Sequence, residues 1–210
     1  MYQGERLNSH THLAGGLLTV LGVCCLLAAA LSTGSPALVL GCSIYGATTL
    51  GMFLASTAYH SVSGPRKVLL RKIDHVAIFV MTAGTFTPFC IGPLREGIGT
   101  PLLLAVWGLA IIGLVLEFTL AQRTRLPSFF LYFAMSFLSI ATFPGIERAL
   151  GTAAVLWIKG GFALYAVGFV FYVLDKKFRG RHLHGVWHLF VIAGAFCHYV
   201  CIFEYVLKRP

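Results

Sequence analysis

Residues 101–121 read PLLLAVWGLAIIGLVLEFTLA, and Glu117 is the single charged side chain among them. A helix needs about 20 predominantly apolar residues to cross the roughly 30 Å hydrocarbon core of a bilayer. This stretch has the length and the composition of such a helix. It therefore predicts that the chain is embedded in a membrane.

The composition of the whole chain supports the same prediction. Of its 210 residues, 58% are hydrophobic and 11% are charged, whereas soluble domains carry about 25% charged residues. The net charge of +9 would suit nucleic acid if the basic residues formed one soluble face. They lie instead in short stretches between apolar runs, so we expect membrane lipids as partners and no nucleic acid.

Six further runs resemble residues 101–121 in length and hydropathy. Helices are expected in all seven, because lipid offers no partner to an open sheet edge and the runs lack the alternation of barrel strands. The first run could serve as a secretory signal, but the long polar segment before it favours a retained span. We predict an all-α integral membrane protein, one domain over residues 1–210. Its seven transmembrane helices are expected at Leu13–Leu31, Ala37–His60, Lys72–Gly92, Pro101–Ala121, Pro127–Ile146, Thr152–Leu174 and His184–Leu207.

Lysine and arginine residues alternate between a rich side and a poor side of these spans. Eleven of the sixteen share the side of the N-terminus, in the groups Arg6, Arg66–Lys67, Arg71–Lys72, Arg123, Arg125, Lys176–Lys177, Arg179 and Arg181. Cytoplasmic loops carry the excess of positive charge. We therefore expect the N-terminus in the cytoplasm, the C-terminus outside, and the protein in the cell membrane.

Small residues inside the spans are expected to serve packing. Glycines let transmembrane helices approach closely, and we expect this of Gly41, Gly46, Gly51, Gly108 and Gly113. The six cysteines lie in or beside spans without paired spacing, so we interpret them as small apolar packing residues.

The polar residues at the span ends indicate a metal site. His60 ends the second span, Asp74 begins the third, and His184 and His188 begin the seventh, all at the predicted cytoplasmic level. The i, i+4 spacing of His184 and His188 puts both rings on one helix face. Three imidazoles and a water form the ligand set of a catalytic zinc site. Asp74 could orient a ligand or the water, and Ser56, one turn before His60, could support it.

Other histidines leave alternatives open. His10 and His12 lie near the same level and could compete as ligands, while His75 is more simply explained by packing or anchoring at the interface. His198 follows His188 by ten residues, about 15 Å of helix. It is too deep for the same ion and is expected to bond between helices or to line a cavity.

Two acidic residues receive structural interpretations. Glu5, Asn8 and His12 are expected to tie the N-terminal segment across the cytoplasmic mouth of the bundle. Glu117 lies inside a span, where a carboxylate needs a partner. We expect it to pair with Arg123 or another basic neighbour.

Four segments resemble one known family. They are GERLNSHTH (4–12), the S-x-x-x-H motif from Ser56 to His60, IDHVAIFVMTAGTFTP (73–88) and HGVWHLFVIAGAFCHY (184–199). Together they are similar to the motifs of the hemolysin III family, which is related to the progestin and adiponectin receptor proteins and more distantly to the alkaline ceramidases.

The resemblance implies one zinc ion near the cytoplasmic leaflet, bound by His60, His184 and His188. It places Asp74 beside the water on the metal, with Ser56 in support. Zinc lowers the pKa of bound water to about 7 and polarises carbonyls, and Asp74 could then act as general base. Hydrolysis of a lipid amide, as by a ceramidase, is the leading hypothesis, with a lipid-like substrate.

Two other functions stay open. A hemolysin-type pore needs a polar stripe through the full thickness of the membrane, whereas the polar cluster lies at one end. A non-catalytic zinc-stabilised regulator of the membrane would need a fourth ligand to close the site, which His10, His12 or Asp74 could supply. A retinal protein is excluded, since the seventh span has no lysine before Lys208. The identity of the lipid and the oligomeric state are left open.

Overall fold

The computed structural model describes residues 4–119, 126–178 and 182–208, which contain helices and no strand. The helices are α1 (Arg6–Ser32), α2 (Pro36–Ser61), α3 (Arg66–Ile91), α4 (Gly99–Thr119), α5 (Leu126–Leu150), α6 (Thr152–Lys177), α7 (Leu183–Cys201) and the π-helix η1 (Ile202–Val206). Seven of the described helices are long and apolar enough to cross a membrane. The prediction of an all-α protein with seven spans is confirmed.

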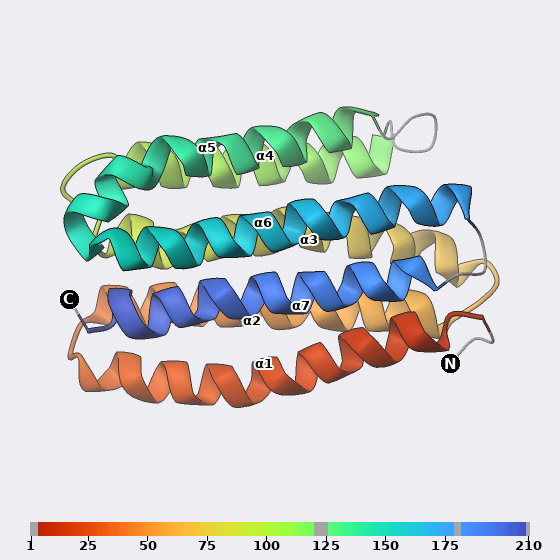
Figure 1. Ribbon diagram of the computed structural model, residues 1–210, viewed down its shortest axis with the longest axis horizontal. Coiled ribbons are helices and arrows are strands. Elements are labelled where there is room, and N and C mark those ends of the chain that lie inside the picture. The colour runs from red at the N-terminus through yellow and green to blue at the C-terminus, as the bar shows by residue number, and fades with distance from the viewer. Residues whose placement is uncertain (1–3, 120–125, 179–181, 209–210) are drawn as a thin grey trace.

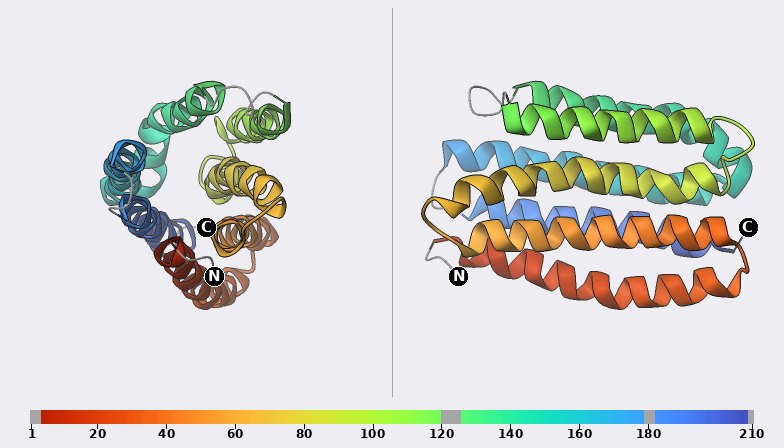
Figure 2. Two further views of the ribbon diagram at one scale, coloured as in Figure 1. Left: turned by 90° about the vertical axis from the view of Figure 1, so that its right-hand side faces the viewer. Right: turned by 180° about the vertical axis from the view of Figure 1, so that it is seen from behind.

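The seven helices form one up-and-down bundle (Figure 1). Viewed along its long axis, α2, α3 and α4 follow one another on one side of a ring, α7, α6 and α5 on the other, and α1 lies between α2 and α7 (Figure 2). The two termini lie at opposite ends of the bundle, as an odd number of crossings requires. Which end is cytoplasmic stays a prediction.

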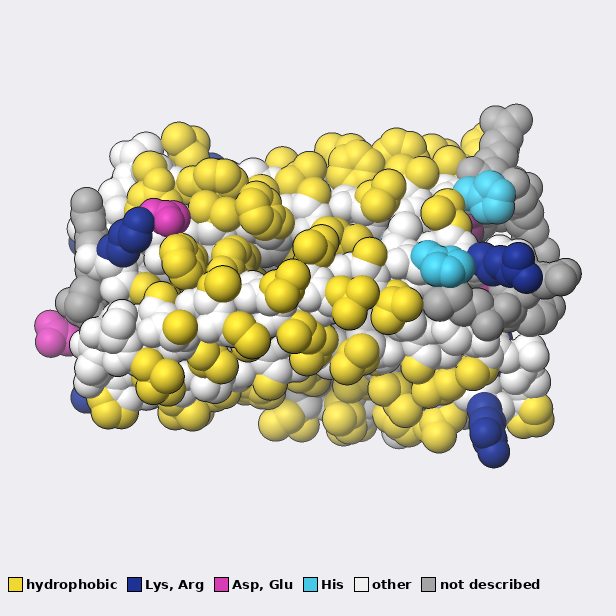
Figure 3. All heavy atoms as spheres, turned by 90° about the horizontal axis from the view of Figure 1, so that it is seen from below, with side chains coloured by type: hydrophobic (Ala, Val, Ile, Leu, Met, Phe, Trp, Pro, Cys, Tyr) yellow, Lys and Arg dark blue, Asp and Glu magenta, His cyan; other side chains and the backbone are white. Residues whose placement is uncertain are grey.

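The outer surface fits a bilayer. Hydrophobic side chains cover the middle of the face shown in Figure 3, and lysine, arginine and acidic side chains gather at its two ends. On α1, for example, Leu17, Leu18 and Leu21 are each more than 60% exposed. Such a belt is favourable only against lipid tails, so the protein is a multi-pass membrane protein.

Two helices begin earlier than the hydropathy predicted. Helix α1 begins at Arg6 and not near Leu13, and α3 begins at Arg66 and not near Lys72. The first turns of α1 contain polar residues that lower the local hydropathy, yet three of these side chains are buried inside the bundle: Ser9, Thr11 and His12. Their segment is therefore helical because it packs against neighbours.

The predicted packing glycines fall into two groups. A Cβ atom at Gly41 would lie 2.9 Å from the Cα of Pro88, so only glycine allows this approach of α2 to α3. A Cβ added at Gly46 would lie 2.7 Å from the side chain of Val23 on α1, and one added at Gly113 would lie 2.5 Å from the side chain of Phe79 on α3. A Cβ at Gly51 or Gly108 would meet open space, so the packing prediction was wrong for these two.

Replacing Gly41 with alanine should destabilise the bundle. Overpacking typically costs about 1–3 kcal/mol, and here backbone would have to move. We expect Gly41→Ala to lower the midpoint of thermal unfolding in detergent, whereas Gly51→Ala on the same helix should leave it unchanged or raise it. Equal midpoints for the two variants would contradict the packing described.

Candidate metal centre

Three histidines converge at the end of the bundle that holds the N-terminus. The ring centroids of His60 lie 5.0 Å from those of both His184 and His188, and the latter two rings lie 4.7 Å apart. One nitrogen of each ring lies within 4.8 Å of the others. These three buried or partly buried imidazoles could bind a single metal ion.

Helix α7 supplies two of the three rings. Its i, i+4 spacing places His184 and His188 on one face of the helix, as the sequence predicted, with their rings in an edge-to-face arrangement. The helix begins after His182, which has a left-handed backbone and no side-chain cap. The carboxylate of Asp175 on α6 accepts a hydrogen bond from the backbone N–H of His184 (3.1 Å) and so satisfies one exposed amide of the first turn.

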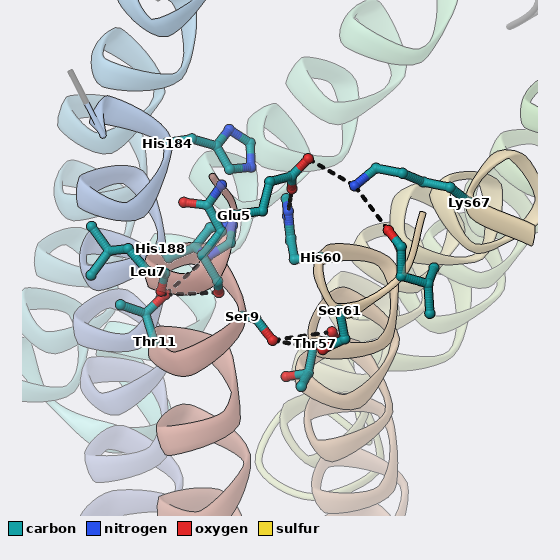
Figure 4. A network of polar contacts seen from close by, with 12 residues as sticks. Glu5, Leu7, Ser9, Thr11, Thr57, His60, Ser61, Lys67, His184 and His188 are labelled. Carbon is teal, nitrogen blue, oxygen red and sulfur yellow. Dashed lines mark hydrogen bonds and ion pairs between the residues drawn. The ribbon is translucent and has the colours of Figure 1, made fainter. Parts of the chain in front are cut away.

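The third ring, His60, is held by a charged contact from the start of α1. Its Nδ1 contacts the carboxylate of Glu5, whose other oxygen accepts from Lys67 Nζ at 2.7 Å (Figure 4). Burial raises the pKa of Glu5, but the hydrogen bonds with Lys67 and His60 outweigh it and lower the pKa below its ordinary value. An ionised carboxylate can only accept, so His60 Nδ1 carries the proton.

The ring of His188 is held by residues of α1. Its Nδ1 lies 3.0 Å from the carbonyl oxygen of Asn8 and 3.1 Å from Thr11 Oγ1. The single hydroxyl proton of Thr11 is shared between the carbonyls of Leu7 and Asn8, so the hydroxyl oxygen is left to accept from His188. His12 stacks on the other side, with its ring centroid 3.6 Å from that of His188 and an interplanar angle of 14°.

The other predicted site residues, Ser56 and Asp74, are buried but lie outside the converging set. Ser56 lies one turn before His60, and Asp74 lies two turns into α3, with 2% and 9% of their surfaces exposed. The group within 4.8 Å contains three histidines and neither of these side chains. His10 is exposed and its Nδ1 lies 2.6 Å from the carbonyl of Arg6, and His12 is also outside the group.

Glu117 finds its partners on other helices. Its carboxylate pairs with His75 Nδ1 on α3 (3.2 Å) and accepts from Ser128 Oγ on α5 (2.8 Å). His75 is thus a basic neighbour of the kind expected for Glu117. The other expected partner, Arg123, lies outside the described residues. The packing role expected of His75 was incomplete, because its ring Nδ1 contacts the carboxylate of Glu117 and its backbone carbonyl accepts a hydrogen bond from Tyr132.

His198 lies apart from the metal ligands, as its spacing predicted. Its ring packs between Phe162 and Tyr165 of α6, at centroid distances of 5.2 and 5.6 Å. Gly161 makes room for it, since a Cβ there would lie 2.6 Å from Nε2. These contacts place the ring between α6 and α7, and the choice between an interhelical hydrogen bond and a cavity lining stays a prediction.

The donor set fits a metal ion. His60 and His188 each carry the proton on Nδ1, so the Nε2 of each ring keeps a lone pair that is free to bind a metal ion. His60 Nε2 is buried and has no hydrogen-bond partner among the described residues. A buried nitrogen without a partner is costly, and a cation held with the other two rings would satisfy it. Neutral imidazoles are preferred ligands of zinc.

Fold and site together define a seven-helix membrane protein with a cluster of three histidines at one end. The chain belongs to the haemolysin-III-related family, whose model matches residues 1–199. It is 36% identical over 208 residues to a hemolysin-3 homolog of Bacillus subtilis (strain 168), covering 98% of this chain and 96% of that protein. Hemolysin-3 of Bacillus cereus is 34% identical (97% and 92% covered). The monocyte to macrophage differentiation factor of Homo sapiens is 26% identical over 178 residues (80% and 71% covered). The expected resemblance to the hemolysin III family is confirmed.

Removing one histidine of the cluster should abolish tight metal binding. We expect purified protein to bind one zinc ion per chain. His60→Ala, His184→Ala and His188→Ala should each weaken zinc affinity by more than about 100-fold, which exceeds the loss typical when a residue that hydrogen-bonds to a ligand is removed. Metal content and competition with a chelator measure this. His10→Ala and His198→Ala serve as controls and should match the unaltered chain; a loss in either would place the ion elsewhere.

Proposed function

We propose that this protein is a zinc-dependent hydrolase of lipid amides, resembling a ceramidase. His60, His184 and His188 hold one zinc ion near the cytoplasmic face of the membrane. The convergence of three imidazole nitrogens within 4.8 Å of one another is the single observation that carries the proposal.

The number of ligands favours catalysis over a purely structural metal. Structural zinc sites usually have four protein ligands, while catalytic sites have three and leave one position open. Within the described residues, no fourth histidine, cysteine or carboxylate joins the group. A zinc-stabilised regulator would need such a ligand.

The chain's own residues supply the other functions of a hydrolase. A bound zinc ion would polarise a carbonyl and lower the pKa of a water molecule to about 7. We assign Asp74 as the general base that takes the proton from the attacking water, and later returns it to the leaving amine. Ser56 supports the site from the turn before His60.

The surroundings suit a lipid substrate. The cluster lies at one end of the bundle, and large apolar side chains are exposed along its helices. A substrate with an acyl chain can keep that chain in the hydrocarbon while its polar amide reaches the bundle end, at the cost of little desolvation. Small soluble substrates gain nothing from this placement.

Membrane lysis is the second candidate, and the name of the Bacillus cereus relative, hemolysin-3, favours it. A pore needs polar side chains along the full thickness of the membrane. Conductance across planar bilayers that survives removal of zinc would support a pore and count against the hydrolase.

The zinc-loaded protein should release fatty acid from a lipid amide. In detergent or liposomes, with a panel of ceramides, other lipid amides and lipid esters, we expect turnover that His188→Ala abolishes. Asp74→Asn should retain zinc but lose about 10²–10⁴-fold in rate, the usual contribution of a general base. Fatty acid release is followed by mass spectrometry.

The exposed Glu204 at the opposite end of the bundle gives the matched control, and Glu204→Gln should keep full activity. If protein with stoichiometric zinc releases no fatty acid above the His188→Ala background from any lipid in the panel, the proposal is wrong.

A further inference from the structure

Glu5, the N-cap of α1, and the first turns of α1 contact two of the three proposed metal ligands at their Nδ1 atoms. Glu5 reaches Nδ1 of His60 on α2, while the Asn8 carbonyl and Thr11 Oγ1 reach Nδ1 of His188 on α7. Figure 4 shows this segment between the two ligand helices. One short segment thus meets two ligands from two different helices.

These contacts set the same tautomer in both rings. A carbonyl oxygen and an ionised carboxylate accept and never donate. Each Nδ1 must therefore carry the proton, and each Nε2 keeps a lone pair for the metal. Metal-binding histidines commonly donate their second N–H to such acceptors, which fixes the ring orientation and raises the basicity of the ligand.

The segment is itself firmly positioned. On the side of α2, Ser9 Oγ lies 2.7 Å from Ser61 Oγ, next to His60. On the side of α7, the absence of a side chain at Gly185 lets α1 approach: a Cβ there would lie 2.6 Å from Leu7 Cδ2 and 3.2 Å from Asn8 Oδ1. The acceptors are therefore held in place by contacts independent of the histidines.

Glu5 also has a counter-charge that favours its ionised form. Lys67 donates to Oε1 at 2.7 Å, leaving Oε2 for His60. Lys67 Nζ is also placed by the Val62 carbonyl (3.4 Å) and by the ring of Tyr59, 4.7 Å from its centroid. The acceptor at His60 is thus an anion, and the strongest partner available for an imidazole N–H.

We infer that residues 5–12 at the start of α1 form the outer shell of the metal centre, and that Glu5 is the positioning residue for His60. This inference rests on the proposed function, because it needs a metal on the Nε2 atoms. It assigns a role in metal affinity to residues that bind no metal and belong to a helix without a ligand.

The test measures zinc affinity and the stability of the metal-free protein separately. Loss of an outer-shell partner typically costs about 10- to 100-fold in metal affinity. We expect Glu5→Ala to raise the Kd for zinc by that factor in competition with a chelator. Glu5→Gln, which keeps an acceptor oxygen but loses the charge, should raise it less. The control Glu204→Gln should bind like the unaltered chain.

If Glu5 has a purely structural role, its substitution should lower the unfolding midpoint of the metal-free protein. The zinc affinity should then not fall stepwise from Glu5→Gln to Glu5→Ala. Cobalt-substituted protein should show a shifted ligand-field spectrum in Glu5→Ala. If Glu5→Ala does not fold, Glu5→Gln carries the test. Wild-type affinity in both variants overturns the inference and leaves the proposed function intact; absence of zinc binding by the unaltered chain overturns both.

Discussion

The hydrogen bond from His60 Nδ1 to Glu5 joins the start of α1 to the end of α2, and the arrangement of the site depends on contacts of this kind. An imidazole enclosed at the end of an apolar bundle needs an acceptor for its N–H and a use for its lone pair. Glu5 provides the first for His60, and the Asn8 carbonyl and Thr11 provide it for His188. The buried Nε2 of His60 has no hydrogen-bond partner among the described residues, and one nitrogen of each of the three rings lies within 4.8 Å of the others.

The sequence predicted the fold well because bilayer thickness imposes a length on each apolar run. It also predicted which histidines meet, since alternating topology put His60 at the depth of His184 and His188. It predicted that Glu5 and Asn8 tie the N-terminal segment to the bundle, but it did not indicate that their partners are His60 and His188. Nor did it indicate the contact of Asp175 with His184, because such contacts depend on how helices are rotated against one another. The early start of α1 was hidden for the same reason: Ser9, Thr11 and His12 are polar in sequence but buried in the fold.

Hydropathy also does not predict which face of its helix a residue occupies. Gly51 and Gly41 look alike within one apolar run, yet one faces open space and the other meets Pro88. Glu117 was expected to find a basic partner, but nothing in the spacing indicated His75 and Ser128, which lie on two further helices. For charges inside spans, the sequence shows that a partner is needed and leaves its identity to the fold.

Location of the metal by anomalous diffraction at the zinc edge, on crystals of the zinc-loaded protein, tests the central claim most directly. We expect one peak at the end of the bundle that holds the N-terminus, about 2.1 Å from Nε2 of His60, His184 and His188. A peak bound through the Nδ1 atoms, or lying at any other group of side chains, would contradict it.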